Sequence, residues 1–101
     1  MIRRPPRLDL VEAEWIAIHG LSFLAGDTAR LGRFLSLTGV GPTDLQHARQ
    51  DPEILAAVLD YLLGDEPLLL EFAANTSKPP ESIQLAWDLL TLESHKRKRE
   101  E

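Results

Sequence analysis

The chain of 101 residues contains no cysteine, which excludes disulfide bridges and metal sites built on thiolates. Aromatic residues are few, and no apolar run approaches the roughly 20 residues that a membrane-spanning helix needs. The basic start is followed by Glu12 and Glu14 rather than by the apolar segment of a signal peptide. We therefore expect a soluble, cytoplasmic protein without a membrane segment.

Sequence patterns that carry chemistry are also missing. There is no glycine-rich phosphate loop, and His19, His47 and His95 form no pair at the spacing of metal ligands. We interpret all three as ordinary surface or boundary histidines. The sequence therefore predicts no catalytic residue, no metal and no cofactor, and an enzyme of unidentified class is the third of our functional hypotheses.

Charge is distributed unevenly along the chain. Residues 8–95 hold four cations against fourteen acids, a formal charge of −10. Because an acidic surface repels phosphate, only the two ends of the chain are candidates for nucleic-acid binding. Charge runs of this kind are usually just solvated. The seven terminal cations are Arg3, Arg4, Arg7, Lys96, Arg97, Lys98 and Arg99.

The chain repeats itself with an offset of 38 residues. Residues 17–49 laid on residues 55–87 give ten identities in 33 positions, where composition alone gives about two or three. We infer an internal duplication with units at about 10–49 and 51–92. The identical positions in the first unit are Leu21, Leu24, Gly26, Asp27, Leu31, Phe34, Thr38, Pro42, Gln46 and Ala48.

Helix signals dominate both units, and β-branched residues are too scarce to indicate strands. Each unit contains a long apolar segment, a Gly-Asp step, a second apolar stripe and a proline that can start a third helix. Aspartate caps a helix by accepting hydrogen bonds from its first amides, and glycine ends one. The predicted stops and caps are Gly26, Asp27, Asp51, Gly64 and Asp65.

These signals predict an all-α protein, a compact six-helix globule whose two three-helix units are related by an approximate two-fold axis. The helical domain should cover residues 8–94, between a disordered basic arm at 1–7 and a charged tail at 95–101 that frays into solvent. The long helices of the two units should meet at the centre. The first of them is apolar on most sides, which places it centrally or at an interface. Trp15 and Trp87 are expected to pack in the core.

The segments around the two Gly-Asp steps resemble a known family. They read LSFLAGDTARLGRFLSLTG from Leu21, LDYLLGDE from Leu59 and LLLEFA from Leu68, with Asp51-Pro52 between them. Over about residues 10–90 the chain resembles a small alphaproteobacterial family of helical proteins, the domain of unknown function 3572. The resemblance implies a short, helical, cytosolic bacterial protein with no assigned activity, and it supplies no catalytic residues.

Surface that differs between the two units is the best candidate for function. Arg30 and Arg33 share one side of a helix, where they can hold a carboxylate or phosphate of a partner or pair with the chain's own acids. Consecutive leucines point in different directions around a helix, so at least one of Leu68 and Leu70 should be exposed. Leu37 raises the same question in the first unit. These leucines either belong to a broadly buried helix or form an apolar patch for a partner or a second subunit.

We therefore expect a non-enzymatic protein-interaction or adaptor module, whose partner is another protein or a second copy of the chain. Its contact residues would be Arg30, Arg33, Leu37, Leu68 and Leu70. The alternative is a nucleic-acid accessory protein that binds weakly through its basic ends, with a strong dependence on salt. Asp27 and Asp65 could form a catalytic pair of carboxylates, but capping explains their position in both units better.

Overall fold

The computed structural model describes the backbone of residues 8–100 and the side chains of residues 8–99. This part of the chain contains six α-helices and one 3-10 helix and no strand, which confirms the predicted all-α class. In chain order the elements are α1 (Leu10–Ala25), α2 (Thr28–Thr38), α3 (Pro42–Gln46), η1 (Ala48–Gln50), α4 (Pro52–Leu63), α5 (Glu66–Thr76) and α6 (Pro80–Glu100). The predicted arm at residues 1–7 lies outside the described residues.

Aspartate side chains begin four of the helices. Asp27 accepts hydrogen bonds from two amides in the first turn of α2, at 3.0 and 3.2 Å. Asp51 accepts from two amides at the start of α4, and Asp65 accepts from one amide at the start of α5. Asp9, which was not predicted, caps α1 with a hydrogen bond of 2.8 Å. Since each cap contributes about 1 kcal/mol, the local sequence fixes where these helices begin.

Glycine follows the last residue of three helices. Gly39 ends α2 with a φ of 75°, in the left-handed region that favours glycine. Gly26 and Gly64 end α1 and α4 with right-handed φ values of −69° and −79°. Gly26 and Gly64 therefore lie at the predicted helix ends, but neither adopts the positive φ that would account for a glycine at that position.

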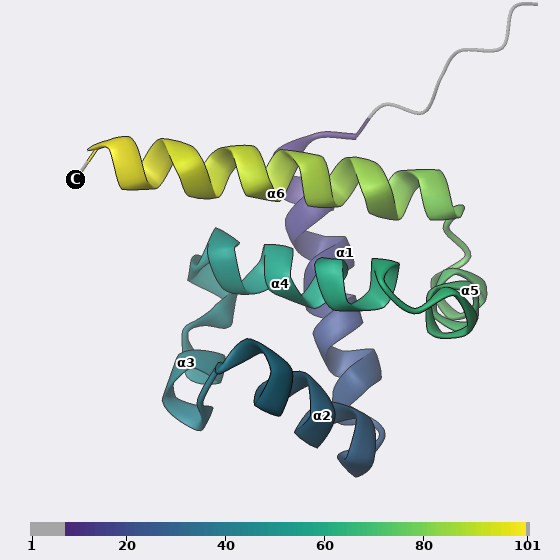
Figure 1. Ribbon diagram of the computed structural model, residues 1–101. Coiled ribbons are helices and arrows are strands. Elements are labelled where there is room, and N and C mark those ends of the chain that lie inside the picture. The colour runs from purple at the N-terminus through teal and green to yellow at the C-terminus, as the bar shows by residue number, and fades with distance from the viewer. Residues whose placement is uncertain (1–7, 101) are drawn as a thin grey trace, which may run out of the picture.

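α1, α4 and α6 form the centre of the molecule (Figure 1). α4 and α6 lie side by side, and α1 crosses behind both of them in this view. α2 lies against α1 at the far side of α4, and α5 lies beyond the end of α4. The two long helices α1 and α4 are thus in contact, as the sequence predicts.

The core is apolar, and five of the six α-helices contribute to it. α4 is buried on most of its sides, and its predicted apolar face is buried throughout. The largest fully buried side chains are Ile16, Leu24, Phe34, Leu55, Val58, Leu59, Leu62, Phe72, Ile83 and Leu90.

Two expectations about the ends of the domain are wrong. α6 does not stop near Ser94 but continues to Glu100, so the predicted frayed tail is helical over residues 95–100. Trp87 packs against the core, whereas Trp15 is 50% exposed. Trp15 is exposed because α1 turns its buried face, which includes Ile16 and Ala17, toward the other helices.

The two predicted units agree in their second helices and differ in their third. α2 and α5 are both 11 residues long, and their bounds are offset by 38 residues. In each helix a threonine, Thr38 or Thr76, donates a hydrogen bond to the carbonyl of the phenylalanine four residues earlier. By contrast, α3 has five residues and α6 has 21, so only α6 is long enough to cross the molecule.

α1 packs closely against α4 at Gly20. A Cβ atom at Gly20 would lie 3.0 Å from Val58 Cγ1 and 3.1 Å from Leu62 Cδ1. Both of these side chains are fully buried, and the β-branched Val58 is held in one rotamer by its helix. The absence of a side chain at residue 20 therefore allows the two helices to pack in contact.

We predict that Gly20→Ala lowers the free energy of unfolding by about 1 kcal/mol, because overpacking outweighs the gain in helix propensity. Gly32→Ala is the matched control, since no atom lies within 4 Å of a Cβ at that exposed helical position. The control should raise the free energy of unfolding by about 0.5–1 kcal/mol. Urea denaturation followed by circular dichroism measures both values. Equal stabilisation by the two substitutions would contradict the close crossing.

Candidate protein-interaction surface

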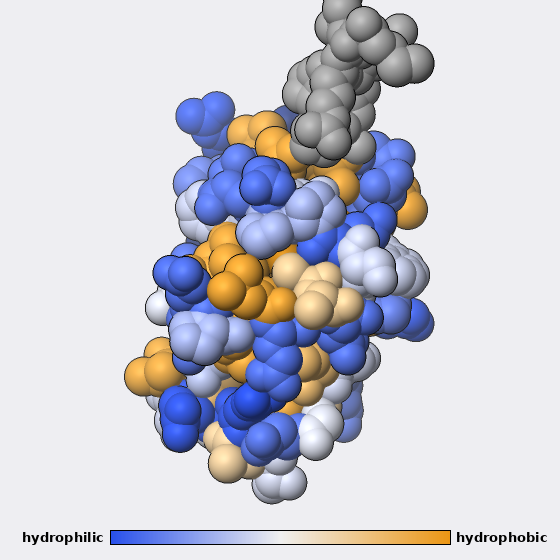
Figure 2. Space-filling model, turned by 90° about the vertical axis from the view of Figure 1, so that its right-hand side faces the viewer, coloured by the Kyte–Doolittle hydropathy of each residue, from blue (hydrophilic) through white to orange (hydrophobic). Residues whose placement is uncertain are grey.

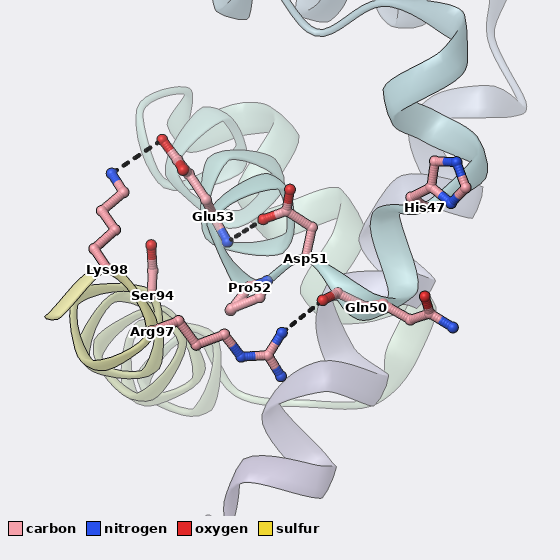
Figure 3. A pocket seen from close by; sticks show the side chains of 8 residues that line it. All are labelled: His47, Gln50, Asp51, Pro52, Glu53, Ser94, Arg97 and Lys98. Atoms are coloured by element: carbon pink, nitrogen blue, oxygen red, sulfur yellow. Dashed lines mark hydrogen bonds and ion pairs between the residues drawn. The ribbon is translucent and has the colours of Figure 1, made fainter. Parts of the chain in front are cut away.

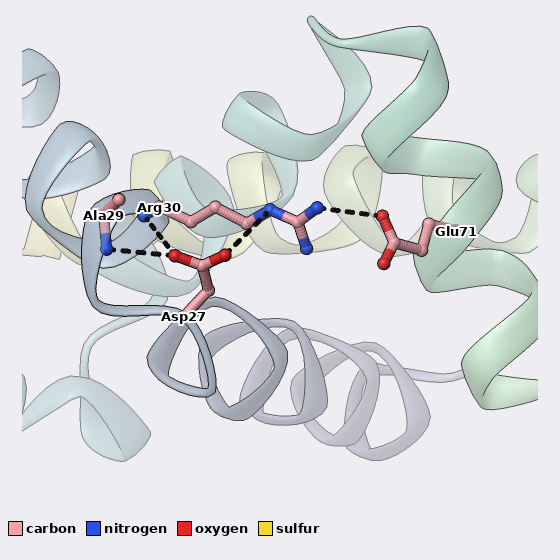
Figure 4. Close-up of polar contacts among 4 residues, drawn as sticks. All are labelled: Asp27, Ala29, Arg30 and Glu71. Carbon is pink, nitrogen blue, oxygen red and sulfur yellow. Dashed lines mark hydrogen bonds and ion pairs between the residues drawn. The ribbon is translucent and has the colours of Figure 1, made fainter.

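Arg30 connects α2 to α5 at the protein surface (Figure 4). Its Nη2 lies 3.1 Å from Glu71 Oε2, and its Nε lies 3.8 Å from Asp27 Oδ2. The guanidinium carbon is 5.6 Å from the centre of the Phe23 ring, which adds a cation–π contact. Of the two alternatives for Arg30, the structure thus shows intramolecular pairing with the chain's own acids.

Arg33 and Leu37 remain on the outer side of α2. They line an open groove of about 330 Å³ between α2 and the end of α4. The other residues that line it are Asp60, Tyr61, Gly64 and Asp65. Leu37 is 71% exposed at the edge of this groove. An apolar side chain and a guanidinium are therefore presented together to solvent.

The groove continues between α2 and α5. An adjacent hollow of about 210 Å³ shares Arg33, Tyr61 and Asp65 with the first. Tyr61 packs edge-on against Phe34, with ring centres 5.6 Å apart, so the wall of the groove is anchored on the core. Among the described residues, no ion pair engages Arg33.

The leucines of α5 differ in their exposure to solvent. Leu68 is only 5% exposed, so its assignment as a contact residue is wrong. It is buried because α5 turns Leu68 and Phe72, one turn apart, toward the core. Leu70 is 52% exposed and is free to touch a partner. Figure 2 looks onto the side of the molecule where α5 lies and shows apolar side chains surrounded by polar ones.

The C-terminal end of α6 is attached to the start of α4 (Figure 3). Arg97 Nη1 donates a hydrogen bond of 2.7 Å to the carbonyl oxygen of Gln50. Lys98 Nζ lies 3.3 Å from Glu53 Oε1. Two of the four predicted C-terminal cations are therefore engaged within the protein, while Lys96 and Arg99 are exposed. Arg3, Arg4 and Arg7 lie outside the described residues.

A cavity of about 450 Å³ lies between these two segments. Lys98 approaches Glu53 on one side of it and Arg97 approaches Gln50 on another, whereas His47 points away from this group (Figure 3). Lys98 and Arg97, the two cations that line this cavity, already contact Glu53 and Gln50 of the protein itself. Neither cation is therefore left without a partner that a ligand could replace. We do not assign it a ligand.

Residues suited to metal binding do not converge in the part of the chain that the structure describes. Within that part, no three His, Asp or Glu side chains gather as they would around a metal ion. His19, His47 and His95 are exposed, as expected. Asp27 and Asp65 are engaged as helix caps. No described helix is both long enough and apolar enough to cross a membrane.

Two exposed residues on α1 were not predicted as surface residues. Val11 is 73% exposed, and Trp15 lies one turn further along the same side of the helix. The centre of the Trp15 ring is 3.8 Å from that of His19. The spacing of apolar residues along α1 could have revealed this second face, because it repeats every three or four residues on both sides of the helix.

These features define a small all-α protein with open surface grooves. The chain belongs to a family described as proteins of unknown function, DUF3572, whose model matches residues 11–92. The resemblance inferred from the Gly-Asp segments is thereby confirmed. No curated protein and no solved structure matches the chain. The last two turns of α6, with the attached Arg97 and Lys98, lie beyond the matched residues.

We predict that the Arg30–Glu71 pair contributes less than about 1 kcal/mol to the free energy of unfolding, since both side chains are partly exposed to water and salt. A double-mutant cycle with Arg30→Ala and Glu71→Ala measures the coupling energy between them. Raising the salt concentration should reduce this energy further. A coupling well above 1 kcal/mol that does not depend on salt would contradict a surface ion pair.

Proposed function

We propose that this protein is a non-enzymatic protein-interaction module that binds another protein through the groove between α2 and the end of α4. The single observation that carries the proposal is the exposure of Leu37 beside the guanidinium of Arg33, at the edge of that groove. Exposed leucines are common one at a time, but here the leucine adjoins a hollow with an aromatic wall. The arrangement resembles a docking groove more than a solvated helix face.

The chemistry of the groove supports recognition of a peptide or helix. Arginine and tyrosine are enriched in protein interfaces, because each combines a large contact area with directed hydrogen bonds. The Arg33 guanidinium can hold a carboxylate with two parallel hydrogen bonds. Leu37 and Tyr61 would cover an apolar side chain of the same partner. A helix with an apolar residue next to an acid would fit this surface.

Leu70 on α5 supplies a second exposed apolar contact in this proposal. Arg30 and Leu68 no longer belong to the contact surface, because the first is paired with Glu71 and the second is buried. The proposed contact residues are therefore Arg33, Leu37 and Leu70.

We predict that Arg33→Glu and Leu37→Asp each abolish capture of the partner while leaving the helical circular dichroism unchanged, because both side chains lie outside the core. Leu92→Asp is the matched control, since Leu92 is another exposed leucine, on α6 and away from the groove. The measurement is affinity capture from a nuclease-treated lysate of the organism that makes the protein, with retained proteins identified by mass.

A protein retained by the wild type and by Leu92→Asp, but lost from both groove variants, supports the proposal. Retention by all four proteins would refute the assignment of the groove. Unfolding of either groove variant would show that the substituted residue is structural. Leu70→Asp, measured in parallel, tells whether α5 belongs to the same interface.

A nucleic-acid accessory role is the second candidate, and one observation favours it. α6 continues as an ordered helix through the basic run, and it presents Lys96 and Arg99, one turn apart, on an exposed side. Two cations against an acidic body would give only weak binding, driven by counterion release.

This second candidate predicts that the double substitution Lys96→Gln, Arg99→Gln weakens nucleic-acid binding and reduces its dependence on salt. The matched control replaces Arg33 and Arg49, two exposed cations elsewhere, by glutamine. Fluorescence anisotropy with a labelled single-stranded oligonucleotide at several salt concentrations measures both quantities. Equal loss in the two double variants would point to net charge rather than to a site on α6.

We place the protein in the bacterial cytoplasm on the strength of the family resemblance inferred from the sequence. We also propose that α1–α3 and α4–α6 arose by duplication and keep an approximate two-fold relation. The equal lengths and matching threonine contacts of α2 and α5 support this, while the unequal α3 and α6 limit it.

A further inference from the structure

α1 has a second apolar stripe on the side that faces away from the core. Its buried stripe contains Ala13, Ile16, Ala17, Gly20 and Leu24. The outer stripe contains the apolar residues Val11, Trp15 and Ile18 and the polar Ser22, at successive spacings of four, three and four residues, and Ile18 also packs partly against the core. This spacing is the seam of a two-helix coiled coil, in which apolar residues recur every 3.5 positions.

The N-terminal part of the outer stripe, with Val11 and Trp15, is exposed to solvent. α1 contacts α4 and α6 and also α2 and α5, and it lies behind α4 and α6 in the view of Figure 1, so that its outer side faces the rear. Val11 is 73% and Trp15 is 50% exposed, and Ile18 is half-buried. A tryptophan exposed to this degree is costly in water, and tryptophan is the residue most enriched among the dominant contacts of interfaces. From Trp15 to Ala25 the helix carries no Asp, Glu, Lys or Arg.

We propose that the outer stripe of α1 pairs with the same stripe of a second copy of this chain, forming an antiparallel homodimer. A two-fold axis between Trp15 and Ile18 would place each Trp15 against Ile18 of the second copy. The same axis would place Val11 against Ser22 at both ends of the seam. The surface is thus self-complementary, as a two-fold interface requires.

Hydrogen-bond complementarity also favours a second copy as the occupant, because an imidazole N–H can donate to a carboxylate. Glu12 and His19 are seven residues apart, so they lie on the same flank of the outer stripe. In the antiparallel pair that flank faces its own equivalent, which brings Glu12 of each copy beside His19 of the other. A parallel pair would instead turn this flank toward the opposite flank of the second copy, so that Glu12 and His19 would not meet. The Trp15 and His19 rings, already 3.8 Å apart, would keep both side chains in position at the seam.

The proposed interface is separate from the groove on α2, so the two proposals can fail independently. One short helix from each copy forms it, which is below the size of a standard interface. We therefore expect a dimer that dissociates on dilution rather than an obligate one. Sedimentation equilibrium of the full chain over a wide concentration range measures its dissociation constant.

Trp15→Glu should raise the dissociation constant of the dimer at least about tenfold, because it removes the central anchor of the seam. Val11→Glu should act in the same direction, and this residue is so exposed that the fold does not depend on it. Leu37→Glu is the matched control, a comparably exposed apolar residue in the groove on α2. It should change the dissociation constant less than about twofold.

A charge exchange tests the antiparallel register. Glu12→Lys and His19→Glu should each weaken the homodimer, because like charges or poor partners then face each other. Mixing the two variants should restore dimerisation, since the lysine introduced in one variant then faces the glutamate introduced in the other. The second flanking contact of the mixed dimer keeps the original Glu12 and His19.

A monomer at every concentration overturns the proposal, as does a dimer that survives both Trp15→Glu and Val11→Glu. A dimer lost equally in the Leu37→Glu control overturns the assigned surface. No recovery when the two charge variants are mixed overturns the antiparallel register.

Discussion

The close crossing of α1 and α4 at Gly20 is the contact on which the rest of the fold depends. Because a hydrogen atom stands where other residues carry a side chain, α1 can approach Val58 and Leu62 of α4 directly. α6 then lies along α4 and across α1, and the three helices enclose one apolar core. The smaller helices α2 and α5 are placed at the ends of this centre. The Arg30–Glu71 ion pair joins α2 to α5, but it contributes less to stability than the packing of the core does.

The local elements of the fold could be predicted from the sequence because their causes are local. Asp27, Asp51 and Asp65 accept hydrogen bonds from amides two or three residues away, and apolar periodicity identified the buried face of α4. The end of α6 could not be predicted in this way. Residues 95–100 are charged and look like a solvated tail, but Arg97 and Lys98 reach acceptors on Gln50 and Glu53, more than forty residues away. Contacts between residues so far apart in the chain produce no periodic pattern in the sequence from which they could be predicted.

The candidate surface was predicted only in part, for a related physical reason. A sequence gives the angle between two residues on a helix, but the rotation of the helix about its axis is set by tertiary packing. Leu68 and Leu70 differ by two positions, and the packing of α5 alone decided that the first is buried and the second exposed. Arg30 and Arg33 share a side of α2, yet only Arg30 reaches Glu71 on the neighbouring helix. Trp15 was misplaced because α1 is apolar on both sides.

The position of α6 in the chain has a consequence for folding during synthesis. Ile83, Ala86 and Leu90 close the core against α1, which the ribosome produces much earlier. The contact between these two helices must overcome the closure entropy of all the chain between them. Until α6 has emerged, the inner stripe of α1 has no cover on that side. The nascent chain therefore keeps this apolar surface without its native cover until α6 has been made, and exposed apolar surface favours chaperone binding and aggregation.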